Sequence, residues 1–159
     1  MLVGIISDTH DNMDQLRKAV ALFNERNVDH LIHAGDFTSP FTFRILNDTK
    51  AGFTGIFGNN DGDKLLLHKM SGGRVFNQPH IFELGGKRFV LIHEHHLAAA
   101  LADSGHYDIV VYGHTHKAEI RKNGDTLVIN PGEAGSWLYG KSTVALLQTT
   151  TMKAEIIDL

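Results

Sequence analysis

Short apolar runs alternate with helical segments over the first third of this chain. The runs have the length of buried strands and comprise residues 2–6, 28–33 and 51–57. Between the first two, apolar residues recur at helical spacing over 16–23, behind a capping box predicted at Asn12 and Gln15. Pro40 predicts the start of a second helix, which ends at Leu46. Strands that alternate with helices in this way are typical of a parallel sheet with right-handed crossovers.

The rest of the chain contains mainly predicted antiparallel pairs. Turn signals at Gly85-Gly86 and at Asn123-Gly124-Asp125 indicate two hairpins. The expected elements are a helix at 63–70, strands at 80–84 and 87–92, a helix at 97–102, and strands at 108–112, 117–121, 126–130, 143–148 and 153–159. A length of 159 residues suits one domain over 1–159. We therefore expect an α/β fold, a two-sheet mixed β-sandwich flanked by helices.

Five predicted strands are followed directly by carboxylate, amide or imidazole side chains. These strand ends carry Asp8-Thr9-His10, Gly35-Asp36, Gly58-Asn59-Asn60-Asp61, His93-Glu94-His95-His96 and Gly113-His114-Thr115-His116. In extended backbone, residues two apart point the same way, so Asp8 and His10 are expected to converge. Ligands of open α/β sheets bind beyond the carboxyl ends of the strands. The pattern predicts a polar site at this edge, because packing of a hydrophobic core would not produce it.

The available donor atoms restrict the kind of cofactor. The chain has no cysteine, which excludes disulfide frameworks, thiolate-ligated metal sites and thiol nucleophiles. Carboxylate and imidazole ligands suit divalent ions such as Mn, Fe, Ni or Zn. A single zinc site needs only three or four protein ligands. The strand ends carry more candidate side chains than one such site needs, which favours two metal ions, about 3.5–4 Å apart, that share one carboxylate.

The motifs D-x-H, G-D, G-N-x-D, H and G-H-T-H, in this order, strongly resemble those of the calcineurin-like metallophosphoesterases. The similarity covers nearly the whole chain and is to the short branch that includes small phosphodiesterases and the retromer scaffold subunit. Asn130-Pro131-Gly132 also matches the family's Asn-Pro-Gly after the hairpin. The resemblance implies the family's two-sheet sandwich and two metal ions. One ion would be held by Asp8, His10, Asp36 and His116, and the other by Asp36 as the bridge together with Asn59, His93 and His114.

The resemblance further implies phosphate-ester hydrolysis, with a metal-bridging hydroxide that attacks phosphorus in line. The candidate catalytic residues are His10, Asp36, Asn60 and His95. Many relatives have histidine in place of Asn60, and an amide cannot donate a proton to the leaving oxygen at useful pH. His95 is either a replacement proton donor or an exposed loop residue. Glu94 replaces the family's usual glycine and adds negative charge near the phosphate.

Loss of the usual acid matters least for leaving groups that depart without protonation, such as those of nitrophenyl esters. The preferred substrate class is a phosphodiester. A phosphomonoesterase and a metal-binding scaffold or interaction module with little activity are the alternatives. The intact set of seven predicted ligands disfavours the scaffold. The expected ions are Mn or Ni, with Zn, Fe and Mg as alternatives.

The remaining polar and aromatic residues have simpler interpretations. Asp61 is expected to support a metal ligand or to cap a helix rather than to bind metal. Trp137 and Tyr139 are assigned to a satellite hydrophobic cluster, with packing over the site or a subunit contact as the alternatives. Structural, hydrogen-bonded roles are expected for His30, His33, His68 and His80.

Charge and hydropathy restrict the partners. A formal net charge of −3 provides no basic field for long nucleic acid, so the expected partner is a small phosphate ester. No apolar run has the length of a membrane span, and residues 1–6 predict a strand rather than a signal peptide. These features predict a cytoplasmic protein without a membrane partner, and they leave open whether it forms a homo-oligomer.

Overall fold

Three predicted strands form the parallel centre of the first sheet in the computed structural model, which describes residues 1–159. The strands of this sheet are β1 (Leu2–Ile6), β2 (His30–His33), β3 (Gly52–Ile56), β4 (Val75–Phe76), β10 (Thr143–Gln148) and β11 (Lys153–Asp158). Their order is β11-β10-β1-β2-β3-β4. β1 to β4 are parallel, and β10 and β11 continue the sheet as the predicted antiparallel pair. β4 is not predicted from the sequence, because two residues are too few for a periodic pattern.

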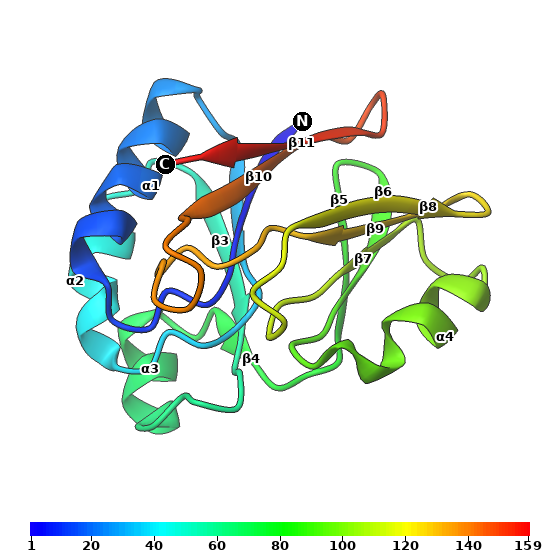
Figure 1. The fold of residues 1–159 in the computed structure, drawn as a ribbon. Helices are drawn as coiled ribbons and strands as arrows, with labels where there is room; N and C mark the ends of the chain where they lie inside the picture. Colours follow the sequence, from blue (N-terminus) through cyan, green and yellow to red (C-terminus); the bar gives the residue numbers. More distant parts are fainter.

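The second sheet is built from the two predicted hairpins and the strand between them. Its strands are β5 (His80–Leu84), β6 (Lys87–Leu91), β7 (Ile109–Val111), β8 (Glu119–Asn123) and β9 (Thr126–Asn130). Their order is β5-β6-β7-β9-β8, with β6, β7 and β9 parallel and β5 and β8 antiparallel at the edges. The expected two-sheet mixed α/β architecture is therefore confirmed (Figure 1).

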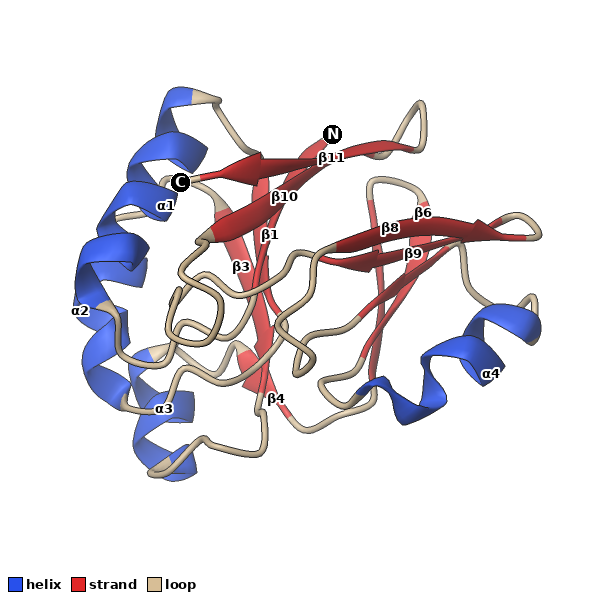
Figure 2. Cartoon of the chain, in the orientation of Figure 1, coloured by secondary structure: helices blue, strands red, loops and turns tan.

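Helices cover the outer faces of both sheets (Figure 2). They are α1 (Met13–Glu25), α2 (Phe43–Leu46, after a 3₁₀ turn at Pro40–Thr42), α3 (Lys64–Met70) and α4 (Ala98–Asp103, after a 3₁₀ turn at His95–Leu97). The predicted capping box forms only in part. Asn12 accepts a hydrogen bond from the Gln15 backbone N–H, but its own N–H donates to Thr9 instead of to the Gln15 side chain. None of the helices combines the length and apolar character that crossing a membrane requires.

Alternation along each strand divides the apolar side chains among three layers. On β2, Leu31 packs in the cluster that contains Phe23 of α1, whereas Ile32 packs between the two sheets. The same division on β7 places Val110 against the cluster with α4 residues. The layer between the sheets comprises Val3, Ile5, Ile32, Ala34, Ile56, Phe89, Leu91, Ile109, Val111, Leu127, Ile129, Ala145 and Leu147. The central strands of each sheet are thus buried on both faces, which holds their ends in a fixed relative position.

Candidate metal centre

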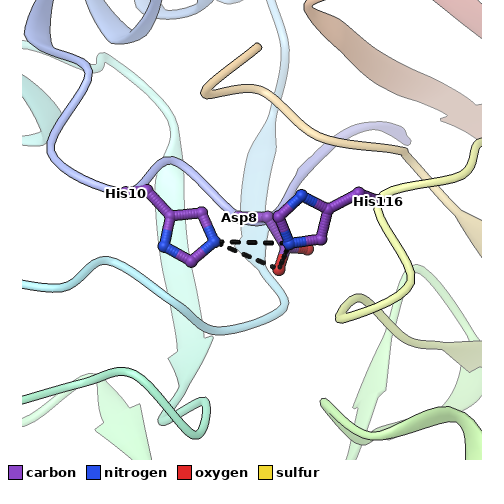
Figure 3. A group of neighbouring side chains, drawn as sticks. All are labelled: Asp8, His10 and His116. Atoms are coloured by element: carbon purple, nitrogen blue, oxygen red, sulfur yellow. Dashed lines mark hydrogen bonds and ion pairs between the residues drawn. The ribbon is translucent and has the colours of Figure 1, made fainter. Parts of the chain in front are cut away.

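Asp8, His10 and His116 converge beyond the end of β1 (Figure 3). The Nε2 atoms of His116 and His10 lie 3.3 Å and 3.7 Å from Asp8 Oδ1, and 3.4 Å from each other. Asp8 is fully buried, and its Oδ1 accepts no hydrogen bond. A buried carboxylate oxygen without a hydrogen bond is costly unless a cation compensates it. This group therefore fits a divalent metal ion.

A second group comprises Asp8, Asp36 and His93, which are all buried, so Asp8 belongs to both groups. His93 Nε2 lies 3.3 Å from Asp36 Oδ2 and 2.9 Å from Asn59 Oδ1. The same Asn59 oxygen is 2.9 Å from His114 Nδ1. Asp36 Oδ2 is also 3.6 Å from His10 Nε2, so this carboxylate lies between His10 of the first group and His93 of the second.

Polar contacts on the outer side of three histidine rings, two hydrogen bonds and one ion pair, leave their inner nitrogens free for a metal. His93 Nδ1 donates to the Ala34 carbonyl oxygen at 2.8 Å, which leaves Nε2 as the donor of the ring lone pair. His10 Nδ1 is 3.3 Å from the Thr38 hydroxyl, and His116 Nδ1 is 3.2 Å from Glu133 Oε2. Metal-ligating histidines typically bind such an oxygen through their second nitrogen. The contacts of the second ring nitrogens of these three histidines are therefore also those expected of metal ligands.

The close packing of carboxylates and imidazoles shifts the pKa values of several residues in these two groups. Burial by itself would raise the pKa of Asp8, but the adjacent rings of His10 and His116 outweigh it and hold that pKa well below its usual range. The Asp8 carboxylate raises the pKa of His116 to about 9. Asp36 also has a lowered pKa, because the contact with His93 outweighs its burial. The neighbouring imidazoles thus stabilise the charged forms of both carboxylates.

The backbone at these residues is left-handed rather than extended. Asp8, His10, Asp36, His114 and His116 have φ angles of 54°, 42°, 60°, 66° and 59°. The expectation that Asp8 and His10 converge because they lie two apart in an extended strand is therefore wrong in its geometry, although the two side chains do meet. Left-handed backbone is unfavourable for residues with a Cβ and is concentrated at functional sites.

Glycines beside the predicted ligands allow the loops to approach one another. A Cβ at Gly113 would collide with Ser7 Oγ and would lie 2.8 Å from Asp8 Oδ2. The side chains of Ser7 and Asp8, just after β1, occupy the space that a Cβ would need. The G-H-T-H loop therefore requires glycine at this position for steric reasons.

Asp61 supports the loop that carries Asp36 and does not bind at the centre. Its buried carboxylate accepts hydrogen bonds from the backbone N–H groups of Gly58, Thr38 and Asp36 at 2.7, 2.8 and 3.2 Å. The supporting role expected for Asp61 agrees with these contacts. The cap of α3 is instead Asp63, whose side chain accepts from the Leu66 N–H.

Replacing Asp61 with asparagine is expected to lower the free energy of unfolding by about 1–3 kcal/mol. The amide would turn an N–H₂ group toward backbone donors and leave at least one of them unsatisfied. Urea denaturation followed by circular dichroism measures the change. Asp63→Asn is the matched control, since asparagine caps a helix as well as aspartate does, and an equal loss in both variants would contradict the supporting role.

The four histidines assigned to structural roles differ in their surroundings. His33 is buried and neutral, because burial lowers its pKa to about 3. Its ring contacts the Thr9 hydroxyl and accepts from the Gly35 N–H, and so connects the first two motif loops. His30 bonds to Thr54, and His80 stacks between aromatic rings. His68 is exposed, with Nδ1 at 2.9 Å from the Val75 carbonyl oxygen.

The two remaining catalytic candidates lie at the rim of the centre. Asn60 donates to Asp36 through both its backbone N–H and its side-chain amide, each at 2.8 Å. His95 is exposed, and its ring stacks on that of His114 with the centroids 5.8 Å apart. Asn60 therefore contacts a predicted ligand directly, and His95 lies beside another.

Glu133 is a site residue that the sequence does not reveal. It follows β9, is 1% exposed, and contacts His116 Nδ1 on one side. On the other side it accepts hydrogen bonds from the backbone N–H groups of Trp137 and Leu138. Six of the parallel strands, β1, β2, β3, β6, β7 and β9, are followed by residues of this site, whereas the motif pattern identifies only five of these strand ends. The Asn130-Pro131-Gly132 motif just before Glu133 is the signal that could have drawn attention to it.

The satellite cluster expected for Trp137 and Tyr139 is wrong. Both side chains are exposed, at 64% and 56%. The Trp137 Nε1–H donates to the backbone carbonyl of His10 at 3.1 Å, which holds the indole beside the candidate metal centre.

The chain is similar in sequence to one protein family over nearly its whole length. The model of the calcineurin-like phosphoesterase superfamily domain matches residues 1–152. A phosphodiesterase of Methanocaldococcus jannaschii is 38% identical over 94% of this chain and 93% of its own length. A probable metallophosphoesterase of Mycoplasma genitalium is 31% identical over 99% of this chain and 91% of its own.

Solved structures share the fold over the whole chain. A novel archaeal phosphodiesterase superimposes with a TM-score of 0.94 at 36% identity, covering 100% of both chains. Vps29 of Entamoeba histolytica, solved with Zn²⁺, has a TM-score of 0.70 at 20% identity, covering 99% of both chains, which shows the fold alone. The family match and the identity to the relatives together settle the classification. This chain belongs to the calcineurin-like phosphoesterase superfamily.

Proposed function

We propose that this chain is a phosphodiesterase that works with two divalent metal ions. The observation that carries the proposal is the position of Asp36 Oδ2, 3.6 Å from His10 Nε2 and 3.3 Å from His93 Nε2, between a histidine of the first group of metal-binding atoms and a histidine of the second. A shared carboxylate between two such groups is what a dinuclear hydrolytic centre requires. Membership of the superfamily and the similarity to archaeal phosphodiesterases support the same reaction.

The proposed ligands of the two ions are the seven residues predicted from the motifs. Asp8, His10, Asp36 and His116 would hold one ion, and Asp36, Asn59, His93 and His114 the other. The contacts of the outer histidine nitrogens support this assignment, because they direct the inner nitrogens of His10, His93 and His116 to the centre. When bound, the two cations would lower the pKa of a water molecule and withdraw negative charge from the phosphate oxygens.

The surrounding side chains would position the ligands and the substrate. Asn60 would hold Asp36 in place through its two hydrogen bonds, which supports a positioning role rather than proton transfer. His95 is the candidate for a direct contact with phosphate, since its exposed ring stacks beside His114. No histidine follows Asn59, which supports the preference for esters whose leaving group departs without protonation.

Mn²⁺ or Ni²⁺ is proposed as the native metal, because the oxygen and imidazole donors suit borderline divalent ions. Zn²⁺ is a further candidate, and it is the ion present in the Vps29 structure from Entamoeba histolytica. We also propose that residues 1–159 form one domain, in line with the family match over 1–152. Cytoplasmic location stays a prediction from the sequence, which leaves open whether the chain forms a homo-oligomer.

A metal titration on matched esters tests the function. Chelated protein is expected to lose hydrolysis of bis(4-nitrophenyl) phosphate, and added Mn²⁺ or Ni²⁺ is expected to restore it. We also expect this diester to turn over faster than 4-nitrophenyl phosphate, which has the same leaving group. A much faster reaction with the monoester would favour a phosphomonoesterase, and hydrolysis that persists after complete removal of metal would contradict the dinuclear mechanism.

A further inference from the structure

Three consecutive large apolar side chains are exposed beside the candidate metal centre. Trp137 and Leu138 are each 64% exposed, and Tyr139 is 56% exposed. Trp137 and Leu138 line a pocket of about 380 Å³ whose other lining residues include His10 and His116. The apolar wall and two of the proposed metal ligands therefore face the same space.

The position of Trp137 is fixed by hydrogen bonds at both its ring and its backbone. The ring Nε1–H donates to the His10 carbonyl at 3.1 Å, and the backbone N–H donates to Glu133 Oε1 at 2.6 Å. Leu138 N–H donates to the same Glu133 carboxylate, which also lies 3.2 Å from His116 Nδ1. One buried carboxylate thus connects the apolar wall to a proposed metal ligand. The indole is held in place before any substrate arrives, which reduces the entropy lost on binding.

The lining of this pocket favours recognition of an apolar group over recognition of a second phosphate. Its five residues are His10, Asn60, His116, Trp137 and Leu138. None is a lysine or arginine, so the lining supplies no permanent cation for further anionic groups. Trp137 offers an aromatic face, on which planar rings stack regardless of their exact substituents.

We propose that Trp137 and Leu138 bind the organic group of the phosphodiester, and that the favoured group carries a planar aromatic ring. The ring is that of an aryl ester or of a nucleobase, since both present the same flat face. This inference rests on the proposed function, because it places the phosphate at His10 and His116. An ester group attached to that phosphate then meets the apolar wall within the same pocket. Trp137 is accordingly a specificity-determining residue.

Two matched pairs of ligands test this inference through binding rather than activity. Phenylphosphonate is compared with methylphosphonate, and adenosine 5′-monophosphate with ribose 5-phosphate, so that the members of each pair differ by a ring. In Zn²⁺-loaded protein, calorimetry is expected to show about tenfold tighter binding of a ring-bearing ligand than of its partner. That ligand should also change the fluorescence of Trp137, the single tryptophan of the chain. A preference confined to one pair identifies the ring as aryl or nucleobase.

Three variants separate stacking from other effects. Trp137→Ala is expected to reduce the preference from about tenfold to less than about twofold. Trp137→Phe lacks the N–H that reaches His10 but keeps a ring, and it should retain most of the preference. Tyr139→Ala removes a neighbouring exposed ring that does not line the pocket, and it should leave the preference unchanged.

Equal binding of both members of each pair to the wild-type protein would overturn the inference, as would an unchanged preference in Trp137→Ala. Hydrolysis of bis(4-nitrophenyl) phosphate by the same wild-type preparation distinguishes a failure of this inference from a failure of the proposed function. Metal-dependent hydrolysis without ring preference leaves the proposed function intact and removes the role of Trp137. Absence of metal-dependent hydrolysis removes the proposed function itself.

Discussion

Replacing Asp36 with asparagine is expected to lower the metal-dependent hydrolysis of bis(4-nitrophenyl) phosphate by more than about a hundredfold. The substitution keeps the size of the side chain and removes the negative charge that lies between His10 and His93. It would also direct an amide toward the side-chain N–H₂ of Asn60, which now donates to Asp36 Oδ2. The measurements are the turnover number at saturating Mn²⁺ and the metal content per chain after dialysis, with about half of the metal expected to be lost.

Asp14→Asn is the control for this substitution. Asp14 is an exposed residue of α1 whose carboxylate pairs only with Arg17 on the same helix, so its loss should leave turnover and metal content unchanged. Circular dichroism of both variants shows whether the fold is retained. Equal rates for wild-type protein and Asp36→Asn would remove Asp36 from the mechanism.

The fold was accessible from the sequence because its strands and helices have clear patterns. The apolar runs that became β1, β2 and β3 are each followed by a turn, and the two hairpins carry glycine in their loops. Consecutive residues of β2 and β7 face opposite sides of their sheets, and both sides are covered at these strands. This explains why Leu31-Ile32 and Ile109–Val111 are runs of consecutive apolar residues. β4 was missed because its pairing depends on the edge that β3 offers and not on its own two residues.

The candidate site was accessible only in its outline. The order of the motifs identified the polar strand ends, but the left-handed backbone at Asp8 and His10 is determined by contacts with other loops. Asp8 N–H donates to the Gly35 carbonyl, and His10 N–H to the Asp36 carbonyl, and both partners are more than twenty residues away in the chain. Contacts between distant segments produce no periodic pattern in the sequence, so the backbone conformation that they determine cannot be predicted from it.

The same reason explains why the sequence alone does not reveal the role of Glu133. A glutamate after a Pro-Gly pair is ordinary in a surface loop, and only the fold brings it against His116. Its contacts with Trp137 and Leu138 also explain why these apolar residues remain beside the site instead of packing into a separate cluster. The position of Trp137 thus depends on the Glu133 carboxylate, which in turn contacts the proposed metal ligand His116.

Gly58→Ala is expected to lower the free energy of unfolding by about 1–3 kcal/mol and to weaken metal binding together with activity. A Cβ at this position would collide with Asp36 Oδ1 and would lie only 2.5 Å from the Asp36 backbone nitrogen. Backbone cannot move aside as a flexible side chain can, so the loop that carries Asp36 must shift. The hydrogen bond from Gly58 N–H to Asp61 would be displaced at the same time. Urea denaturation and a Mn²⁺ titration by calorimetry measure the two effects.

Gly62→Ala, four residues further along the same loop, separates this steric requirement from a general effect on the loop. A Cβ at Gly62 would meet only the Thr38 carbonyl oxygen, at 3.5 Å, which is ordinary van der Waals contact. Its stability should therefore change by less than about 0.5 kcal/mol, and its affinity for Mn²⁺ should be that of the wild type. If Gly58→Ala behaved like Gly62→Ala, the close approach of the two loops would be too soft to position Asp36. The glycine of the G-N-x-D motif would then serve the turn and not the metal centre.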